Sequence, residues 1–316
     1  MSENVSENMP PKVGAQGEIF SANVNANIRS VVRYGLYPFL LVATLGFALW
    51  AITSGKELSS AFAWVMGARF AFLLGFEFML PMKPEWRMSW RSFGRDLLYI
   101  VMNGGVSAIA RWLIVFFAIT SAEKNSGWLS DAPIVFGLIA TALTFEFFQY
   151  WLHRLSHEAK GPIGSFLWRI HVAHHLPDRV YLLMHPVMHP FNMLASFTII
   201  QGVLLLIGAS PEAIFLFSAL MSLQGLISHF NVEIHAGPLN YFLVGTELHR
   251  DHHSADPHES KNYGVVTPFW DLVFGTFHYR PGHAPARLGV ERPADYPDSA
   301  AIHKVMMLPF YSSTSK

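Results

Sequence analysis

Long apolar stretches are the feature of this sequence that most limits its fold. A helix that crosses a bilayer needs about 20 mostly apolar residues, and four stretches meet this length. They run from Tyr34 to Thr53, from Ala61 to Leu80, from Leu98 to Thr120 and from Pro133 to Leu152. Of the 316 residues, 52% are hydrophobic and only 14% are charged, a balance that soluble domains of this size rarely show. The sequence therefore predicts a membrane protein.

Two shorter apolar stretches, Phe191 to Gly208 and Ala213 to Ser228, are joined by the turn-like segment Ala209-Ser210-Pro211. They predict a hairpin that spans as a tight pair, with entry and exit on one side as the alternative. The expected fold class is all-α: a polytopic membrane helical bundle of four spans plus this hairpin, with a cytosolic histidine-rich helical cap. We expect a cytosolic N-terminal tail (1–30), a membrane-embedded domain (31–279) and a cytosolic C-terminal tail (280–316).

Basic residues in short loops predict the orientation, because cytoplasmic loops are enriched in Lys and Arg. The loop between the second and third spans holds four of them, Lys83, Arg87, Arg91 and Arg95. With this loop in the cytoplasm, the fourth span ends there near Leu152, and the hairpin returns there at His229. Every histidine group then lies on the cytoplasmic face of a cell inner membrane or of the endoplasmic reticulum.

Two arginines, Arg69 and Arg111, lie inside predicted spans, where a charge is costly and usually faces a polar partner. Asn103 and Glu77 are the candidate partners. Helix packing, or extension of the side chain toward the interface, is the preferred interpretation for both arginines.

The composition excludes several kinds of site. The chain has no cysteine, which excludes disulfides, thiolate zinc sites and iron–sulfur clusters. Its 22 Lys and Arg residues are balanced by 22 Asp and Glu residues, so it lacks the basic excess of nucleic-acid proteins. Any metal ion must be bound by histidine or oxygen ligands, and nucleic acid is not an expected partner.

All 16 histidines lie between His153 and His303. Eight of them fall into three spaced groups, and a ninth precedes the last group. They are His153 and His157 in HRLSH, His171, His174 and His175 in HVAHH, His249, His252 and His253 in HRDHH, and the lone His229. Residues three and four apart share a face of a helix, so each group presents neighbouring imidazoles.

Nine imidazoles exceed what one metal ion binds, since an ion takes about four to six ligands. The two HxxHH groups would also repel when protonated and lose hydration when neutral, unless a cation organises them. The sequence therefore predicts two metal ions. The other histidines are expected to serve turns or the surface, with His235 between the two cases. They are His185, His189, His258, His278, His283 and His303.

These groups resemble the motifs of the fatty acid hydroxylase superfamily, which contains sterol desaturases, methylsterol oxidases, sphingolipid hydroxylases and carotenoid hydroxylases. EFFQYWLHRLSH resembles its first histidine box, WRIHVAHH its second and ELHRDHHS its third. NYGVVTPFWDLVFGTF resembles its closing segment, which implies that Asn262-Tyr263-Gly264 and Trp270-Asp271 support the last helix and its ligands. The likeness covers Glu77 to Phe277.

The resemblance implies a non-haem di-metal centre, O₂ as co-substrate and a lipid-like substrate drawn from the bilayer. It also implies that His229, within HFN, is a metal ligand. Members of the superfamily differ at a tenth ligand position, for which the candidates here are His235 and, through a water molecule, Asn231. Some relatives carry a fused haem domain. We expect no room for one here, so electrons should come from a separate ferredoxin or b-type cytochrome.

Oxidation of an unactivated C–H bond requires a redox metal, which favours two iron ions, with zinc as a metal that isolated protein could hold. Asp251 and Asp271 are candidate acceptors for imidazole N–H groups. Surface salt bridges, for Asp251 with Arg250 or Arg154, are the alternative. The predicted function is oxygen-dependent oxidation of a lipid or sterol-like substrate, with hydroxylation ahead of desaturation.

Two other classes of function stay open. An intramembrane zinc hydrolase needs a general base beside the metal, typically within HExxH. Neither His157-Glu158 nor His258-Glu259 is followed by the second histidine of that motif. A non-catalytic metal transporter or metal sensor would place polar ligands at mid-membrane depth, whereas the histidines begin just beyond the predicted spans.

Overall fold

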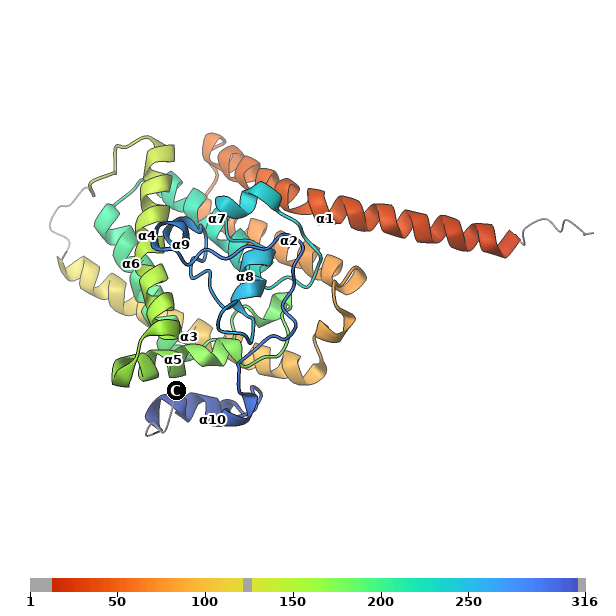
Figure 1. Ribbon diagram of the computed structural model, residues 1–316. Helices are drawn as coiled ribbons and strands as arrows, with labels where there is room; N and C mark the ends of the chain where they lie inside the picture. The colour runs from red at the N-terminus through yellow and green to blue at the C-terminus, as the bar shows by residue number, and fades with distance from the viewer. Residues whose placement is uncertain (1–12, 122–126, 312–316) are drawn as a thin grey trace, which may run out of the picture.

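The computed structural model describes residues 13–121 and 127–311, and apart from two isolated β-bridges their regular structure is helical (Figure 1). The longer helices are α1 (Val13–Thr53), α2 (Leu58–Met79), α3 (Trp90–Ser121), α4 (Ile134–Glu158), α6 (Pro190–Ile207) and α7 (Pro211–Ser228). The shorter helices are α5 (Gly161–His175), α8 (Thr246–His252), α9 (Phe269–Phe274) and α10 (Ile302–Met307). Short 3₁₀ turns lie between them: η1 (Pro84–Trp86), η2 (Leu182–Met184), η3 (Gly237–Tyr241), η4 (Pro293–Asp295) and η5 (Leu308–Phe310). The predicted all-α fold class is confirmed.

Four helices among the described residues are long and apolar enough to cross a membrane: Ala26–Thr53 within α1, and the whole of α2, α4 and α7. α3 covers the predicted span from Leu98 to Thr120, but from residue 113 its side chains lie outside the described part of the chain. Large apolar side chains project outward from these helices, as Val42 (71% exposed) and Trp64 (77%) do. A bilayer accommodates such a surface and water does not, so the chain is an integral membrane protein.

The turn between α6 and α7 forms as its sequence predicts. Gly208 ends α6 in the left-handed conformation, with φ of 56°, which glycine adopts without steric cost. Ser210 then caps α7 by accepting the Ala213 N–H at 3.3 Å, and Pro211 occupies the first turn, where its missing N–H costs nothing. The two arms are not the tight pair we expected, because α6 packs on α3, α4 and α5 while α7 packs on α1, α2 and α4.

α7 is the central helix of the bundle, and its buried face holds Phe217, Leu223 and Ile227. Burying one such side chain stabilises the fold by roughly 1.5–3 kcal/mol. α7 ends at Ser228, and the following residue, His229, is its C-cap and is also buried. The packing of α7 therefore places His229 at one end of the bundle.

The polar groups inside the bundle join neighbouring helices, in agreement with the helix-packing interpretation of Arg69. Arg69 donates to Thr44 Oγ1 of α1 at 3.2 Å. It also donates to two groups on α7, the Ala219 carbonyl and Ser222 Oγ, and not to Glu77. Glu77 accepts the Leu182 N–H at 2.8 Å, and Asn103 donates to two backbone carbonyls after η2. These contacts tie α2 and α3 to the segment that follows α5.

The cap over the histidine end of the bundle consists of α5, α8, α9 and the C-terminal segment. α5 and α10 lie together at the bottom of Figure 1. Val305 of α10 and Leu308 of η5 pack against Val172 and Ala173 of α5, all four being buried. The C-terminal segment thus covers the helix that carries the second histidine group.

Candidate metal centre

The nine histidines form two groups. The five-histidine cluster consists of His153, His157, His171, His175 and His252, and the four-histidine cluster of His174, His229, His249 and His253. Within each cluster the candidate ligand atoms lie within 4.8 Å of one another. Eight of the nine side chains are buried and His157 is partly buried. Each cluster is therefore compact enough to bind one ion.

Both HxxHH groups are divided between the clusters. In α5, His171 and His175 belong to the five-histidine cluster while His174 belongs to the other. At α8 the assignment is reversed: His249 and the C-cap residue His253 share the four-histidine cluster, and only His252 turns away. Successive residues of a helix differ by about 100° in direction, so adjacent histidines face different centres. The two clusters must be neighbours, because α5 and α8 each contribute to both.

Hydrogen bonds fix the imidazole orientation of four ligands. Three of them contact a backbone carbonyl through Nδ1: His153 with Tyr263 at 2.8 Å, His174 with Val187 at 3.0 Å, and His252 with Lys261 at 2.8 Å. A carbonyl oxygen only accepts, so Nδ1 carries the proton and Nε2 keeps its lone pair. His171 Nδ1 likewise lies 2.8 Å from Asn192 Oδ1. In all four rings the lone pair points into a cluster.

The four-histidine cluster has the spacing of ligands around one ion. Five of its six Nε2 pairs lie 3.0–3.2 Å apart. The sixth pair, His174 and His249, is wider, with ring centroids 6.0 Å apart against 4.4–5.0 Å for the others. Adjacent octahedral ligands about 2.1 Å from an ion are about 3.0 Å apart, and opposite ones about 4.2 Å. His174, His229, His249 and His253 would therefore hold one ion among their nitrogens.

The five-histidine cluster has a different arrangement. The ring of His157 lies 4.8–5.3 Å from each of the other four, which form a circle with neighbours 4.4–4.9 Å apart. Across this circle, His171 and His252 are 6.4 Å apart. Nε2 of His157 and of His252 is buried without a hydrogen-bond partner. These five imidazoles would hold one ion, with His157 on one side of the circle formed by the other four.

The protonation state of the ligands also fits metal binding. Burial lowers the pKa of His171 to about 4 and that of His174 to about 3. Both imidazoles are therefore neutral near pH 7, and the neutral ring is the form that binds a metal ion. The Nδ1 contacts of His153 and His171 leave a lone pair on each Nε2, and these two Nε2 atoms lie 3.1 Å apart, where they repel each other unless a cation lies between them. The residues present fit two ions with imidazole ligands.

A small cavity of about 60 Å³ touches both clusters. Its histidine lining comprises His153, His171, His174, His229, His249 and His185. Apolar walls are supplied by Leu152, Met188 and Val265. Of the five-histidine cluster, His153 and His171 line this cavity and His157 does not.

A larger polar cavity, of about 710 Å³, touches the five-histidine cluster from the other side, at His157 and His175. Trp168 of α5 lines it, with its ring 5.2 Å from that of His157. The indole N–H of Trp168 donates to the Tyr296 hydroxyl at 2.7 Å, and Tyr296 also lines the cavity. An aromatic contact therefore connects the cavity wall with a predicted ligand.

Two of the predicted ligands do not reach either cluster. His235 packs edge-on against Tyr34, with ring centroids 5.6 Å apart, and its Nε2 is 3.6 Å from Glu233. Asn231 donates to the Lys83 carbonyl at 2.9 Å and accepts the Lys83 N–H at 3.1 Å. His235 therefore contacts α1, and Asn231 contacts the loop after α2.

Asp251 and Asp271 do not orient the ligands in the way we predicted. Asp251 lies 3.5 Å from Nδ1 of His283, outside both clusters. Asp271 accepts the N–H groups of Tyr263 and Gly264, each at 2.8 Å. Its effect on the site is indirect, because the carbonyl of Tyr263 accepts from His153.

Glu146 supports the same loop from α4. Its carboxylate accepts the N–H groups of Val265 at 3.1 Å and of Thr267 at 3.2 Å. Glu146 and Asp271 are both buried, and together they hold the loop from residue 263 to residue 267. This loop supplies the carbonyl that orients His153 and, through Val265, a wall of the small cavity.

Two residues near the clusters were not predicted. Asn192, in the first turn of α6, accepts from His171. His185, which we assigned to a turn or the surface, lines the small cavity, and its Nδ1 is 3.4 Å from Nδ1 of His229. Asn192 carries no sequence signal of its own, because it reaches the site from the start of a helix. His185 and His189 in HPVMH have the spacing of the first histidine group, but the segment between them contains Pro186 and is not helical, so the two side chains do not share a helix face.

The fold and the site define a polytopic membrane protein with two adjacent all-histidine sites. Residues 138–276, which contain all nine clustered histidines, match the sequence model of the family described as Fatty acid hydroxylase. This match confirms that the histidine region is similar to the fatty acid hydroxylase superfamily, as its motifs predicted.

Individual relatives agree with this assignment. The ornithine lipid hydroxylase OlsE of Rhizobium tropici is 29% identical over 276 residues, which cover 84% of this chain and 81% of that protein. Human alkylglycerol monooxygenase is 30% identical over 136 residues, 43% of this chain and 29% of that protein. A very-long-chain aldehyde decarbonylase of Oryza sativa subsp. indica is 23% identical over 178 residues, 52% of this chain and 27% of that protein. No solved structure is significantly similar to the chain.

Proposed function

We propose that this protein is a membrane di-iron oxidoreductase that oxidises a lipid with O₂, with hydroxylation ahead of desaturation. The observation that carries the proposal is that two all-histidine clusters line one small cavity within an integral membrane protein. The printed names of the relatives, which include a lipid hydroxylase and a monooxygenase, support the reaction class.

The proposed ligands are the nine clustered histidines. Iron bound there would supply the redox chemistry that cleaves O₂ and oxidises a C–H bond, which zinc does not. In hydroxylation one oxygen atom enters the lipid and the other leaves as water, with two electrons and two protons supplied from outside. Desaturation uses the same inputs but removes two hydrogens from the lipid and releases both oxygen atoms as water.

The residues of the small cavity would position the substrate. Leu152, Met188 and Val265 present apolar surface beside the histidines of both clusters, as a hydrocarbon segment requires. Burial of the clusters keeps bulk water from the reacting carbon, which limits side reactions. Because hydroxylation needs no residue beyond those that hold the metals and the substrate, it is the preferred reaction.

Electrons would enter through the polar cavity, from a separate donor protein such as a ferredoxin or a b-type cytochrome. This cavity meets the five-histidine cluster at His157 and His175, on the side away from the small cavity. Trp168 lies between His157 and Tyr296 of the cavity wall. A donor docked here would not obstruct the lipid.

The histidine end would face the cytoplasm, at a cell inner membrane or the endoplasmic reticulum. A chain without native cysteine allows a clean labelling test of this orientation. Single Ser89→Cys and Lys160→Cys variants, both at exposed positions, should react with an impermeant thiol reagent only from the cytoplasmic side, and Ser54→Cys only from outside. Labelling of positions 89 and 160 from opposite sides would refute the shared face.

Turnover under ¹⁸O-labelled O₂, in membranes supplied with reductant, tests the proposed reaction. A hydroxylase places the label in the lipid product, and a desaturase consumes O₂ and yields an unlabelled product that has lost two hydrogens. Full activity without O₂, or label that comes only from water, would contradict both versions and favour the zinc hydrolase.

A further inference from the structure

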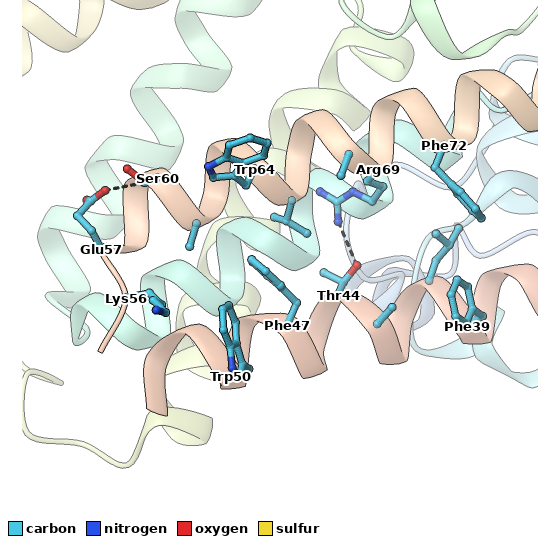
Figure 2. Close-up of a pocket in the computed structure, with 15 residues that line it drawn as sticks. Phe39, Thr44, Phe47, Trp50, Lys56, Glu57, Ser60, Trp64, Arg69 and Phe72 are labelled. Carbon is cyan, nitrogen blue, oxygen red and sulfur yellow. Dashed lines mark hydrogen bonds between the residues drawn. The ribbon is translucent and has the colours of Figure 1, made fainter. Parts of the chain in front are cut away.

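A groove runs between α1 and α2 on the outside of the bundle, far along the chain from the histidine groups. Figure 2 shows it lined by side chains of both helices, and its volume is about 720 Å³. Both helices are among the four that can span a membrane. The groove shares no lining residue with the small cavity beside the metal centre. We call it the α1–α2 groove.

The shape of the groove favours a hydrocarbon chain over another helix. Alanines at positions 43, 61 and 68 contribute small side chains to the lining, while aromatic side chains project around them. Phe39 and Phe72 approach across the groove, with ring centroids 6.4 Å apart. A helix is about 10–12 Å wide and packs in membranes where small residues allow its backbone to come close. The aromatic rim keeps a helix out, whereas a single acyl chain is narrow enough to enter.

The outer end of the groove has the chemistry of a membrane–water interface. Trp50 and Lys56 lie there, beside Glu57 at the start of α2 (Figure 2). Tryptophan and lysine are enriched at this depth. The Lys56 ammonium is 5.5 Å from the Trp50 ring, and within the described part of the chain it forms no ion pair. The Glu57 carboxylate is engaged with the backbone N–H groups of Ser59 and Ser60. Lys56 is therefore available to an anionic group.

The inner part of the groove is bounded by a polar bridge. Arg69 donates to Thr44 of α1 and to Ser222 of α7, at 3.2 and 2.5 Å, which joins three helices inside the membrane. From Glu57 to Phe72 the groove follows α2 for about 22 Å, at about 1.5 Å per residue. One leaflet contributes about 15 Å of hydrocarbon. The groove is long enough for an acyl chain that enters from the interface at Lys56.

We propose that the α1–α2 groove binds one phospholipid, with an acyl chain between the helices and its phosphate at Lys56. The lipid belongs to the leaflet on the side of the α1–α2 loop, opposite the histidine end. It fills the space between two helices that otherwise meet through few side chains, and so it holds α1 in place beside α7. The site is independent of the oxidation proposed for the metal centre.

Native mass spectrometry of the full-length protein tests the proposal, with detergent-delipidated protein given phosphatidylglycerol or phosphatidylcholine. Wild-type protein should retain about one phospholipid per chain. Ala68→Trp, which fills the groove, should abolish retention, whereas Ala71→Trp, at an exposed position of the same helix outside the groove, should not. Lys56→Glu should remove a preference for phosphatidylglycerol of about fivefold, the contribution of one lysine near an anionic headgroup.

Circular dichroism and metal content establish that the variants fold. Equal retention by Ala68→Trp and wild type would overturn the proposal, as would equal loss in both tryptophan variants. A wild-type dimer that Ala68→Trp dissociates would show that a second copy of the chain, and not a lipid, occupies the groove.

Discussion

The two histidine clusters differ in how many histidines they contain and in which cavities they contact. The five-histidine cluster contacts the polar cavity through His157 and His175 and the small cavity through His153 and His171. The four-histidine cluster contacts the small cavity through His174, His229 and His249 and contributes no residue to the polar cavity. With fewer histidines, the four-histidine cluster would leave an ion more room for a further small molecule, and the contact with the polar cavity makes the five-histidine cluster the better site for electron entry.

Their supporting hydrogen bonds differ as well. In the five-histidine cluster, His153, His171 and His252 each have an acceptor for Nδ1–H. In the four-histidine cluster, His174 has an acceptor in the Val187 carbonyl, but Nδ1 of His249 and of His253 is buried without one. Because such acceptors hold a ligand ring in place and raise its basicity, we infer that the five-histidine cluster binds its ion more tightly.

Removal of His229 should have the largest effect. Its Nε2 lies 3.0–3.1 Å from that of each other member of its cluster. His229→Ala should lower the metal content from about two ions per chain to about one and reduce lipid oxidation by more than about 100-fold. Elemental analysis and product formation measure both, with the exposed His303→Ala as the control. Two retained ions with full turnover would show that His229 is not a ligand.

Acid should release the metals over a defined range. Burial lowers the pKa of His171 to about 4 and of His174 to about 3, from an ordinary value of 6.5. A histidine with a lowered pKa stabilises the folded state fully above pH 6.5, and this contribution is lost as the pH falls toward the folded value. Thermal stability and metal content should therefore both fall between about pH 6.5 and 4. Stability that rises over this range would contradict neutral buried ligands.

Asn192 offers a test that leaves the ligand set intact. Asn192→Leu removes the acceptor for His171 Nδ1 and should weaken metal binding at the five-histidine cluster by about 10–100-fold. Competition with a chelator measures the affinity. Asn192→Asp keeps an acceptor and should restore most of it. If both variants bind metal as wild type does, the contact has no part in holding the site.

The smallest effect is expected at Trp168. Trp168→Leu removes the aromatic contact between His157 and Tyr296, so a protein donor should reduce the metals several-fold more slowly, while dithionite reduces them at the wild-type rate. Stopped-flow absorbance follows both reactions, with the exposed Trp128→Leu as the matched control. Equal slowing with both reductants would indicate a structural role and would remove the proposed entry route.

The sequence predicted which histidines lie together better than it predicted their division between two clusters. All nine histidines in the clusters follow from helical spacing and motif resemblance, because that periodicity is local. Their division was not predictable, since it depends on how α5 and α8 are oriented around the two centres. The orienting groups were missed for a related reason: three are backbone carbonyls, which no side chain marks, and Asn192 comes from the start of another helix. His235 was misleading because it follows the box-like HFN segment yet turns toward α1.

Mössbauer spectroscopy of ⁵⁷Fe-grown protein, purified anaerobically in lipid nanodiscs, tests the central claim most directly. The account predicts about two iron ions per chain in two inequivalent sites of equal population, one with five imidazole ligands and one with four. It also predicts that His229→Ala removes one of the two signals and leaves the other. A single iron site, or a protein without iron that still oxidises lipid, would contradict it.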